Sequence, residues 1–250
     1  AISMIGVSSI GMLIFTTRPV GDAMATTIWG TSSSWTLTAL PLFVWMGEIL
    51  FRTKLSENLF KGLAPWMSRL PGGLIHVNIV GCALFAAISG SSAATVATVG
   101  KMSIPELRKR NYPEKLLLGS LAGSGTLGLL IPPSIILIIY GVTVQESIAK
   151  LFIAGIIPGI MIAIIFMLYV IIWSIINKKE MPTSNESFSF IEKIKGSKQL
   201  LPVILLITAV IGSIYAGIAT ATEAASLGVV GALILSFFQK SLNKETFKLS

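Results

Sequence analysis

The stretch Ile88-Ser89-Gly90-Ser91-Ser92-Ala93 interrupts an apolar, charge-free run that extends from residue 70 to residue 100. A second interruption, Gly123-Ser124-Gly125-Thr126-Leu127-Gly128 followed by Ile131-Pro132-Pro133-Ser134, lies within the charge-free run 116–145. Glycine weakens a helix, and proline removes a backbone donor and clashes with the preceding turn. We therefore expect two broken helical elements, each within an apolar segment.

The composition around these breaks is that of a membrane protein. Of the 250 residues, 53% are hydrophobic and only 12% are charged, against about 25% charged in soluble domains. Several charge-free runs exceed the roughly 20 residues that cross a bilayer as a helix. This excludes a water-soluble enzyme, a disordered chain and a disulfide scaffold, and it predicts an all-α polytopic membrane protein. A single cysteine, Cys82, and a single histidine, His76, exclude a metal site built from such residues.

The net charge of +8 comes from Lys and Arg in short segments between apolar runs, which reports orientation in a membrane rather than a nucleic-acid partner. Segments 52–69 and 101–115 are both strongly basic, so both belong on the cytoplasmic side. Two full crossings between them need about 40 residues, and the run 70–100 has 31. We therefore expect a re-entrant helical hairpin over 71–100, from about Gly73 to the break and back to Lys101. The alternative is one long tilted helix with a tolerated Ser/Gly patch.

The second break predicts a crossing helix over 116–140 that unwinds around 123–133. Broken elements of this kind are typical of secondary transporters, where half-helix ends and unwound carbonyls hold substrate and ions. Neither break contains Asp, Glu, Lys or Arg, so a cation there would be held by carbonyl and hydroxyl oxygens, which suits a hard monovalent ion. The alternative is that the glycines only allow close helix packing, although that leaves Pro132-Pro133 unexplained.

Several strings occur in an order that resembles a known family. They are Ala39-Leu40-Pro41-Leu42-Phe43, Leu70-Pro71-Gly72-Gly73-Leu74, Ile88-Ser89-Gly90-Ser91-Ser92-Ala93, Gly125-Thr126-Leu127-Gly128 with Ile131-Pro132-Pro133-Ser134, Tyr140-Gly141, Leu151-Phe152-Ile153-Ala154-Gly155 with Pro158-Gly159, and Thr222-Glu223-Ala224. Together the strings resemble the large membrane (permease) subunit of tripartite ATP-independent periplasmic (TRAP) transporters, over nearly the whole chain.

The resemblance implies a multi-pass protein of the bacterial inner membrane, with inverted repeats and an elevator-type alternating-access mechanism. It implies Na⁺-coupled import of organic acids such as C4-dicarboxylates or sialic acid, with Na⁺ as the coupling ion and no other cofactor. The implied partners are a small TRAP membrane subunit and a periplasmic substrate-binding protein. By position, the implied ion and substrate residues are Ser89, Gly90, Ser91, Ser92, Gly123, Gly125, Thr126, Gly128, Pro132, Pro133 and Ser134, with Na⁺ near Ser89, Ser91 and Thr126.

The same resemblance suggests how the chain is organised. Residues 1–70 would form scaffold helices and an amphipathic arm helix, and residues 71–177 the first part of the transport domain, ending in a helix over 151–177. Residues 178–199 would be a cytoplasmic linker, and residues 200–250 would begin an incomplete second repeat. We expect the chain to be a fragment of a longer permease, with half of a transport site.

Three rival functions remain at this stage. The first is a Na⁺-coupled anion or dicarboxylate carrier of related fold that needs no periplasmic partner. The second, an intramembrane enzyme, lacks a nucleophile–base pair or metal cluster, and the third is a purely structural subunit. Among isolated polar residues, Glu48 stands four positions before Arg52, which predicts a helix-face ion pair rather than proton coupling. His76 is expected to bond a neighbouring helix.

Overall fold

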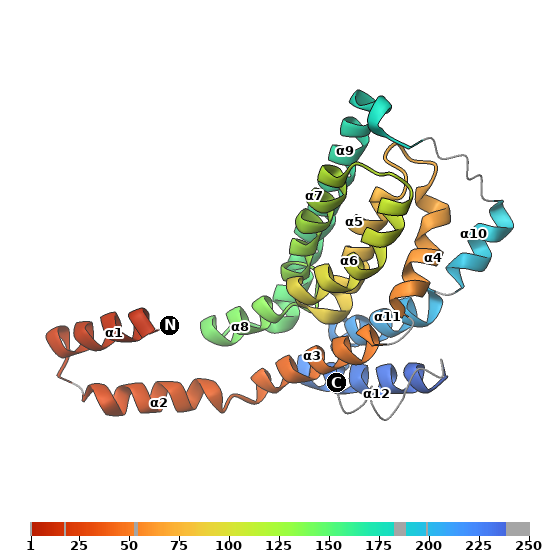
Figure 1. Ribbon diagram of the computed structural model, residues 1–250. Coiled ribbons are helices and arrows are strands. Elements are labelled where there is room, and N and C mark those ends of the chain that lie inside the picture. Colours follow the sequence, from red (N-terminus) through yellow and green to blue (C-terminus); the bar gives the residue numbers. More distant parts are fainter. Residues whose placement is uncertain (1, 18, 53–54, 183–188, 199, 239–250) are drawn as a thin grey trace.

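The computed structural model describes the chain except for residues 1, 18, 53–54, 183–188, 199 and 239–250. Within the described residues every regular element is helical (Figure 1). In chain order the elements are α1 Ile2–Phe15, α2 Val20–Ser32, the 3₁₀ helix η1 Trp35–Thr38, α3 Ala39–Phe51, α4 Leu55–Met67, α5 Ile75–Ser89, α6 Ser92–Lys109, α7 Glu114–Gly125, η2 Thr126–Leu129, α8 Ile135–Val144, α9 Ile148–Ile176, η3 Lys178–Glu180, α10 Phe190–Ser197, α11 Leu201–Tyr215 and α12 Ala221–Phe238.

Helices α5 and α6 pack against each other along the run that the sequence predicts to be broken. The chain turns at Gly90, and the outer ends of the pair meet where the backbone N–H of Leu74 donates to the Tyr112 hydroxyl at 3.1 Å. One long helix over 70–100, the alternative interpretation, is therefore wrong. The second arm is longer than expected, because α6 continues past Lys101 to Lys109.

Two groups of helices form the body of the molecule (Figure 1). In the first, α5 packs against α6, α7 and α9; in the second, α12 packs against α3 and α11. The groups join where α3 contacts α5. Close approach within the second group depends on Gly228, because a Cβ at that position would lie 2.5 Å from the Met46 sulfur.

Helix α4 forms where the sequence predicts an amphipathic arm helix, and it packs against α10. The Trp66 indole N–H donates to the Ser197 hydroxyl at 2.8 Å, and the Lys193 amine lies 5.4 Å from the centre of the Trp66 ring. Helix α10 lies within 178–199, the segment for which the sequence predicts a cytoplasmic linker without indicating a helix. The missed signal is a capping box, in which the Glu192 carboxylate accepts from the Ser189 backbone N–H at 2.8 Å.

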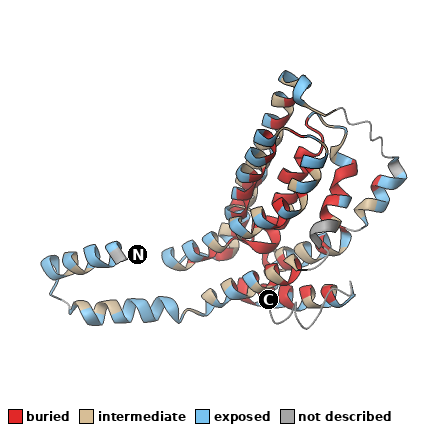
Figure 2. Cartoon of the chain, viewed as in Figure 1, coloured by how far each residue is buried: buried red, intermediate tan, exposed pale blue. Residues whose placement is uncertain are grey.

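Burial separates this body from the N-terminal arm. Figure 2 shows buried residues gathered in α5, α6, α7, α3 and α12, whereas α1 and α2 extend away from the body and are mostly exposed. The arm is nevertheless apolar, and Trp29 is 75% exposed. Exposed apolar area of this extent marks a membrane or protein contact.

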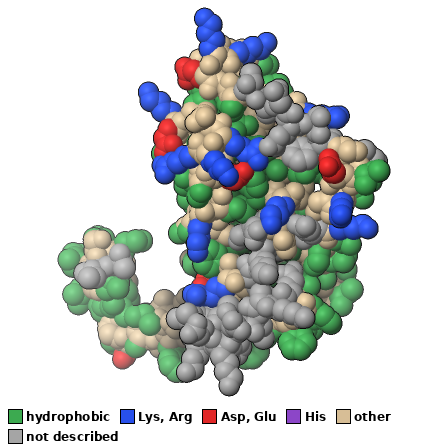
Figure 3. Space-filling model, turned by 45° about the vertical axis from the view of Figure 1, so that its right-hand side comes forward, with side chains coloured by type: hydrophobic (Ala, Val, Ile, Leu, Met, Phe, Trp, Pro, Cys, Tyr) green, Lys and Arg blue, Asp and Glu red, His purple; other side chains and the backbone are tan. Residues whose placement is uncertain are grey.

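By length and composition, two of the described helices can cross a membrane, α9 and α12, or up to four spans if each bent pair of helices counts as one. One such pair is α2 with η1 and α3, bent by 49°. Figure 3 shows Lys and Arg side chains gathered mainly over the upper half of the molecule, while the α1–α2 arm is largely hydrophobic. This uneven distribution fits a protein whose apolar surface faces lipid.

Two expectations about single polar residues have different outcomes. The predicted ion pair is confirmed, since Arg52 and Glu48 approach within 2.6 Å. The prediction for His76 is wrong, because its ring Nε2 contacts the carbonyl of Pro71 at 2.8 Å, within its own segment. A carbonyl only accepts, so Nε2 carries the proton and donates to Pro71. This hydrogen bond stabilises the turn that precedes α5.

Candidate functional site

The two sequence interruptions meet in space. The backbone N–H of Ile135, at the start of α8, donates to the carbonyl of Gly90 at 3.2 Å. A Cβ placed on Gly90 would overlap the carbonyl oxygen of Pro133. The candidate site is therefore the junction between the α5–α6 turn and the segment from Gly125 to Ser134, which we call the break junction.

The α5–α6 turn follows from its residue types. Gly90 ends α5 in the left-handed region with φ +59°, a conformation that glycine adopts without steric cost. Ser91 is extended, and its hydroxyl accepts from the Ala94 backbone N–H at 3.4 Å, capping α6. A helix stop followed directly by a helix start reverses the chain in very few residues.

Hydroxyl groups of the turn bond to backbone and side-chain groups of the turn itself and of the start of α6. The Ser89 and Thr95 hydroxyls lie 3.0 Å apart, and the Thr95 hydroxyl also donates to the Ser91 carbonyl at 2.7 Å. Thr95 is not among the residues predicted from the sequence, although it stands four residues after Ser91 and hence on the same helix face. The Ser92 hydroxyl differs from these, because its oxygen is buried and has no hydrogen-bond partner among the described residues.

The second break begins later than expected. Helix α7 continues through Gly123 to Gly125, so the predicted unwinding at Gly123 is wrong, and a 3₁₀ turn then covers Thr126–Leu129. The non-helical part follows at 130–134 and includes a cis peptide between Pro132 and Pro133. There the buried Ser134 hydroxyl donates to the carbonyl of Leu129 at 2.7 Å.

Glycines of the second break allow direct contact with the turn. A Cβ on Gly128 would lie 2.8 Å from the Ser92 backbone nitrogen and 2.9 Å from the Ser91 carbonyl carbon. A Cβ on Gly125 would overlap the Val96 side chain. Main chain thus packs against main chain, which a Cβ at Gly128 would prevent. The glycines do permit close packing, as the alternative interpretation proposed, but the contact they permit is between the two breaks.

Not every predicted site residue reaches the junction. Thr126 is exposed, and its hydroxyl donates to the carbonyl of Gly123 at 2.7 Å within its own turn. Gly123 itself faces the Phe166 ring of α9, 3.5 Å from where its Cβ would be. The structure brings the residues of the α5–α6 turn together with three residues of the second break. These predicted residues are Ser89, Gly90, Ser91 and Ser92 from the turn, and Gly125, Gly128 and Pro133 from the second break.

Helix α3 covers the turn from the other side. A Cβ on Gly47 would lie 2.9 Å from the Ser89 Cα, so α3 touches the backbone of the turn directly. Gly47 is not among the residues predicted from the sequence; the available signal was a glycine among large side chains in Val44-Trp45-Met46-Gly47-Glu48-Ile49. The break junction is therefore contacted by helices from both groups.

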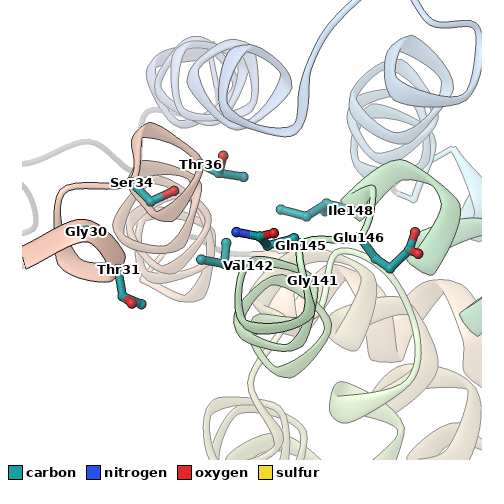
Figure 4. Close-up of a pocket in the computed structure, with 9 residues that line it drawn as sticks. All are labelled: Gly30, Thr31, Ser34, Thr36, Gly141, Val142, Gln145, Glu146 and Ile148. Carbon is teal, nitrogen blue, oxygen red and sulfur yellow. The ribbon is translucent and has the colours of Figure 1, made fainter. Parts of the chain in front are cut away.

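A polar cavity of about 500 Å³ opens between the α2–η1 bend and the α8–α9 turn. Figure 4 shows the Gln145 amide pointing toward the side of the cavity that carries Ser34 and Thr36, and the Glu146 carboxylate pointing away. Gln145 ends α8 with φ +57°, and its amide can donate and accept. Hydroxyls, an amide and backbone groups thus line most of this cavity.

The break junction has the chemistry of a site for a hard cation. Its groups are hydroxyl and carbonyl oxygens, and the Ser92 oxygen is a buried acceptor without a hydrogen-bond partner among the described residues. Buried polar atoms are normally satisfied, so one left over at a junction of two breaks fits a ligand oxygen. In the part of the chain that the structure describes, no cluster of three His, Cys, Asp or Glu residues stands as an alternative metal site.

Interrupted apolar helices that meet through their main chain are typical of secondary membrane transporters. Comparison with known proteins identifies the family. The chain belongs to the DctM family, described as the "Tripartite ATP-independent periplasmic transporter, DctM component", whose profile matches residues 1–249. This is a family of transport permeases and not of enzymes.

The chain is similar to permeases from several bacteria. It is 34% identical over 216 residues to the C4-dicarboxylate TRAP transporter large permease protein DctM of Pseudomonas aeruginosa, covering 86% of this chain and 50% of that protein. It is 36% identical over 201 residues to the ectoine TRAP transporter large permease protein TeaC of Halomonas elongata, covering 80% and 46%. It is 34% identical over 215 residues to the sialic acid TRAP transporter permease protein SiaT of Haemophilus influenzae, covering 85% and 34%. The chain thus spans half the length of the first of these relatives and less than half of the other two.

Proposed function

We propose that this chain is part of the large permease subunit of a Na⁺-coupled TRAP transporter that imports an organic acid across the bacterial inner membrane. The small membrane subunit and a periplasmic substrate-binding protein would be its partners. The observation that carries the proposal is the break junction, where the Gly90 carbonyl accepts from Ile135 and Gly128 packs on Ser91 and Ser92. Membership of the DctM family supports the transporter class.

The coupling ion belongs at the break junction in this proposal. Ser92 would offer its unpartnered hydroxyl oxygen, and Ser89 and Ser91 would hold the turn through their bonds to Thr95. A bound Na⁺ would supply positive charge that favours a nearby carboxylate of the substrate. Thr126 remains a proposed ligand only if its hydroxyl exchanges the bond to Gly123 for one to the ion.

We propose that the α5–α6 pair is a re-entrant hairpin and that the first repeat moves by an elevator-type mechanism against a scaffold that includes α2 and α3. Two observations support this assignment. The ends of α5 and α6 meet at Leu74 and Tyr112, as a segment that enters and leaves on one side requires. A polar cavity of about 500 Å³ is also lined by residues of α2 and η1 on one side and of α8 and α9 on the other, and in this proposal these belong to the two parts that must shift relative to each other.

Uptake into proteoliposomes tests the function. The complete permease, reconstituted with its small subunit, is offered a labelled organic acid with and without the binding protein. We expect uptake only with the binding protein and an inward Na⁺ gradient, and none when K⁺ replaces Na⁺. Uptake without the binding protein would identify a partner-independent carrier instead. Uptake that ignores Na⁺ would contradict the coupling.

A matched pair of variants tests the site. Ser91→Leu removes the hydroxyl that caps α6 and adds bulk to the turn that Gly128 contacts, so Na⁺-dependent uptake should fall at least tenfold, as expected for the loss of about 1.4 kcal/mol of binding. Thr126→Leu alters an exposed residue of the second break. Equal loss in both variants keeps Thr126 in the ion site, and loss in Ser91→Leu alone removes it. Unchanged Na⁺ dependence in both would refute the break junction as the site.

A further inference from the structure

A second cavity, distant in sequence from the break junction, lies at the end of α9. It has a volume of about 480 Å³, and the turn before α5, Tyr112 and the α9–η3 segment line it. Ser174, Lys178 and Met181 contribute from the α9 side, and Leu70 to Gly73 from the other. We call it the α9-end cavity.

The α9-end cavity contains a buried polar group without a partner. Ser174 is only 4% exposed, and its hydroxyl makes no hydrogen bond among the described residues. Gly72 packs closely beside this hydroxyl, because a Cβ there would lie 3.1 Å from the Ser174 oxygen and 2.6 Å from the Val170 side chain. A buried hydroxyl beside a cavity is a donor available for a ligand.

The charge of the lining residues selects an anion. Lys178, the first residue of η3, is the one charged side chain among the described residues that line the cavity, and Ser174 near the end of α9 lines it as well. An ammonium and a hydroxyl together bind phosphate oxygens through charge-assisted hydrogen bonds. The Tyr112 hydroxyl, which accepts from the Leu74 N–H, forms part of the same wall.

The surface next to the cavity selects a lipid over a soluble anion. Leu70, Ile175 and Met181 add apolar walls to the polar groups. On α9, Ile172, Ile175 and Ile176 are 56%, 50% and 74% exposed, so an apolar surface continues from the cavity along the helix. Lys178 closely follows this candidate span, at the position where basic residues meet anionic headgroups.

We propose that the α9-end cavity binds the headgroup phosphate of an anionic phospholipid, whose acyl chains lie along the exposed apolar face of α9. Ser174 and Lys178 would hold the phosphate. Because the site rests on α9 and on the turn before α5, bound lipid would brace the start of α5, independently of the ion site at the other end of that helix.

Native mass spectrometry of the complete purified permease, titrated with phosphatidylglycerol or phosphatidylcholine, tests the proposal. We expect phosphatidylglycerol to bind at least fivefold more tightly, and Lys178→Gln to remove about that factor, since one basic residue near a membrane surface contributes about this much. Ser174→Ala should weaken phosphatidylglycerol binding as well, and Lys178→Arg should retain most of it. Lys179→Gln is the matched control, because Lys179 adjoins Lys178 but does not line the cavity.

Each other outcome contradicts a defined part of the proposal. Equal losses in Lys178→Gln and Lys179→Gln would show a general charge effect and refute the site. Displacement of phosphatidylglycerol by millimolar inorganic phosphate or glycerol phosphate would show that the cavity takes soluble phosphate and refute the lipid. A melting temperature equal to that of the wild type in every variant verifies that the proteins are folded, so that a loss of phosphatidylglycerol binding reports the cavity itself.

Discussion

Helices α5 and α9 are both long, apolar and free of Asp, Glu, Lys and Arg over most of their length, yet they occupy different environments. Of the 15 residues of α5, 12 are buried, including His76, Asn78 and Ser89. Of the 29 residues of α9, only 6 are buried. The exposed residues of α9 are mostly Ile, Leu and Met, and its buried ones include Gly155, Gly159 and Ser174.

The difference shows that hydropathy alone does not separate a helix that faces lipid from one enclosed by protein. Lipid tails are as apolar as leucine, so helices in a bilayer associate through packing and through small and polar residues. Polar side chains of α5 bond to neighbouring helices, since the Asn78 amide nitrogen donates to the Ser120 hydroxyl at 3.1 Å and the Ser89 and Thr95 hydroxyls lie 3.0 Å apart. Helix α9 instead buries few residues, among them Gly155, Gly159 and Ser174, and exposes most of its large aliphatic side chains.

The largest expected effect tests this comparison with one residue type. Ile88 in α5 is fully buried, whereas Ile164 in α9 is 52% exposed. Ile88→Ala leaves a cavity and should lower the free energy of unfolding by about 4 kcal/mol. Ile164→Ala should cost less than about 1 kcal/mol, because lipid fills the space. Unfolding of the complete permease in mixed micelles measures both, and equal losses would contradict the assignment of α9 to lipid.

A second prediction extends the comparison from helices to turns. Gly90 and Gly217 both have positive φ, +59° and +69°, but Gly90 packs against Pro133, whereas a Cβ on Gly217 would have no atom within 4 Å among the described residues. Gly90→Ala adds a steric overlap to the strain of a left-handed alanine and should lower the free energy of unfolding by about 3 kcal/mol. Gly217→Ala keeps only the strain, about 1 kcal/mol. Thermal or chemical unfolding measures both variants. Equal losses in the free energy of unfolding would contradict the close contact between Gly90 and Pro133.

The sequence predicts that both helices are broken and roughly where, but it does not predict at which residue the second break begins. Gly90 and Ser91 carry local signals, a helix stop and a helix start, so the first break lies at the expected residues. Gly123 lies in the same glycine-rich stretch as Gly125, but tertiary packing against Phe166 keeps it in α7. Local propensity is a weak signal that packing overrides, which is why the second break begins later than predicted.

Contacts between distant segments lie beyond what local patterns indicate. Nothing near Gly47 shows that α3 will meet Ser89, and nothing near Gly123 shows that it will face Phe166 of α9. Helix α10 is a different case, because Ser189 and Glu192 form a capping box that the sequence already contains. The sequence thus predicts where the two breaks lie, while the fold decides which of their residues meet.

A third prediction compares two glycines on the same helix. A Cβ on Gly125 would overlap the Val96 side chain, whereas no described atom lies within 4 Å of that position at Gly119. Gly125→Ala should lower the free energy of unfolding by about 2 kcal/mol, since a β-branched neighbour adapts poorly. Gly119→Ala should be neutral or raise it by up to about 1 kcal/mol, because alanine favours a helix. A loss at Gly119 equal to that at Gly125 would refute the specific contact with α6.

The smallest expected effect concerns two serines of α6 whose hydroxyls are buried. Their substitution by alanine tests the proposed ion site, because the two variants should respond differently to Na⁺. The hydroxyls of Ser92 and Ser103, both in α6, are buried and without a hydrogen-bond partner among the described residues. Removing such a group by substitution with alanine should raise the free energy of unfolding by about 1 kcal/mol in Na⁺-free buffer, since an unsatisfied buried hydroxyl is costly. Thermal melts with and without Na⁺ then separate the two residues.

If the Ser92 oxygen is a ligand of the coupling ion, Na⁺ should stabilise the wild-type permease and the Ser103→Ala variant equally, and the Ser92→Ala variant much less. Loss of one of the few oxygen ligands weakens binding, and stabilisation by a ligand falls with its affinity. Equal Na⁺ responses in the two variants would remove Ser92 from the ion site. The unpartnered Ser92 hydroxyl would then be a purely structural consequence of the close contact between Gly128 and the turn, and it would lower the free energy of unfolding.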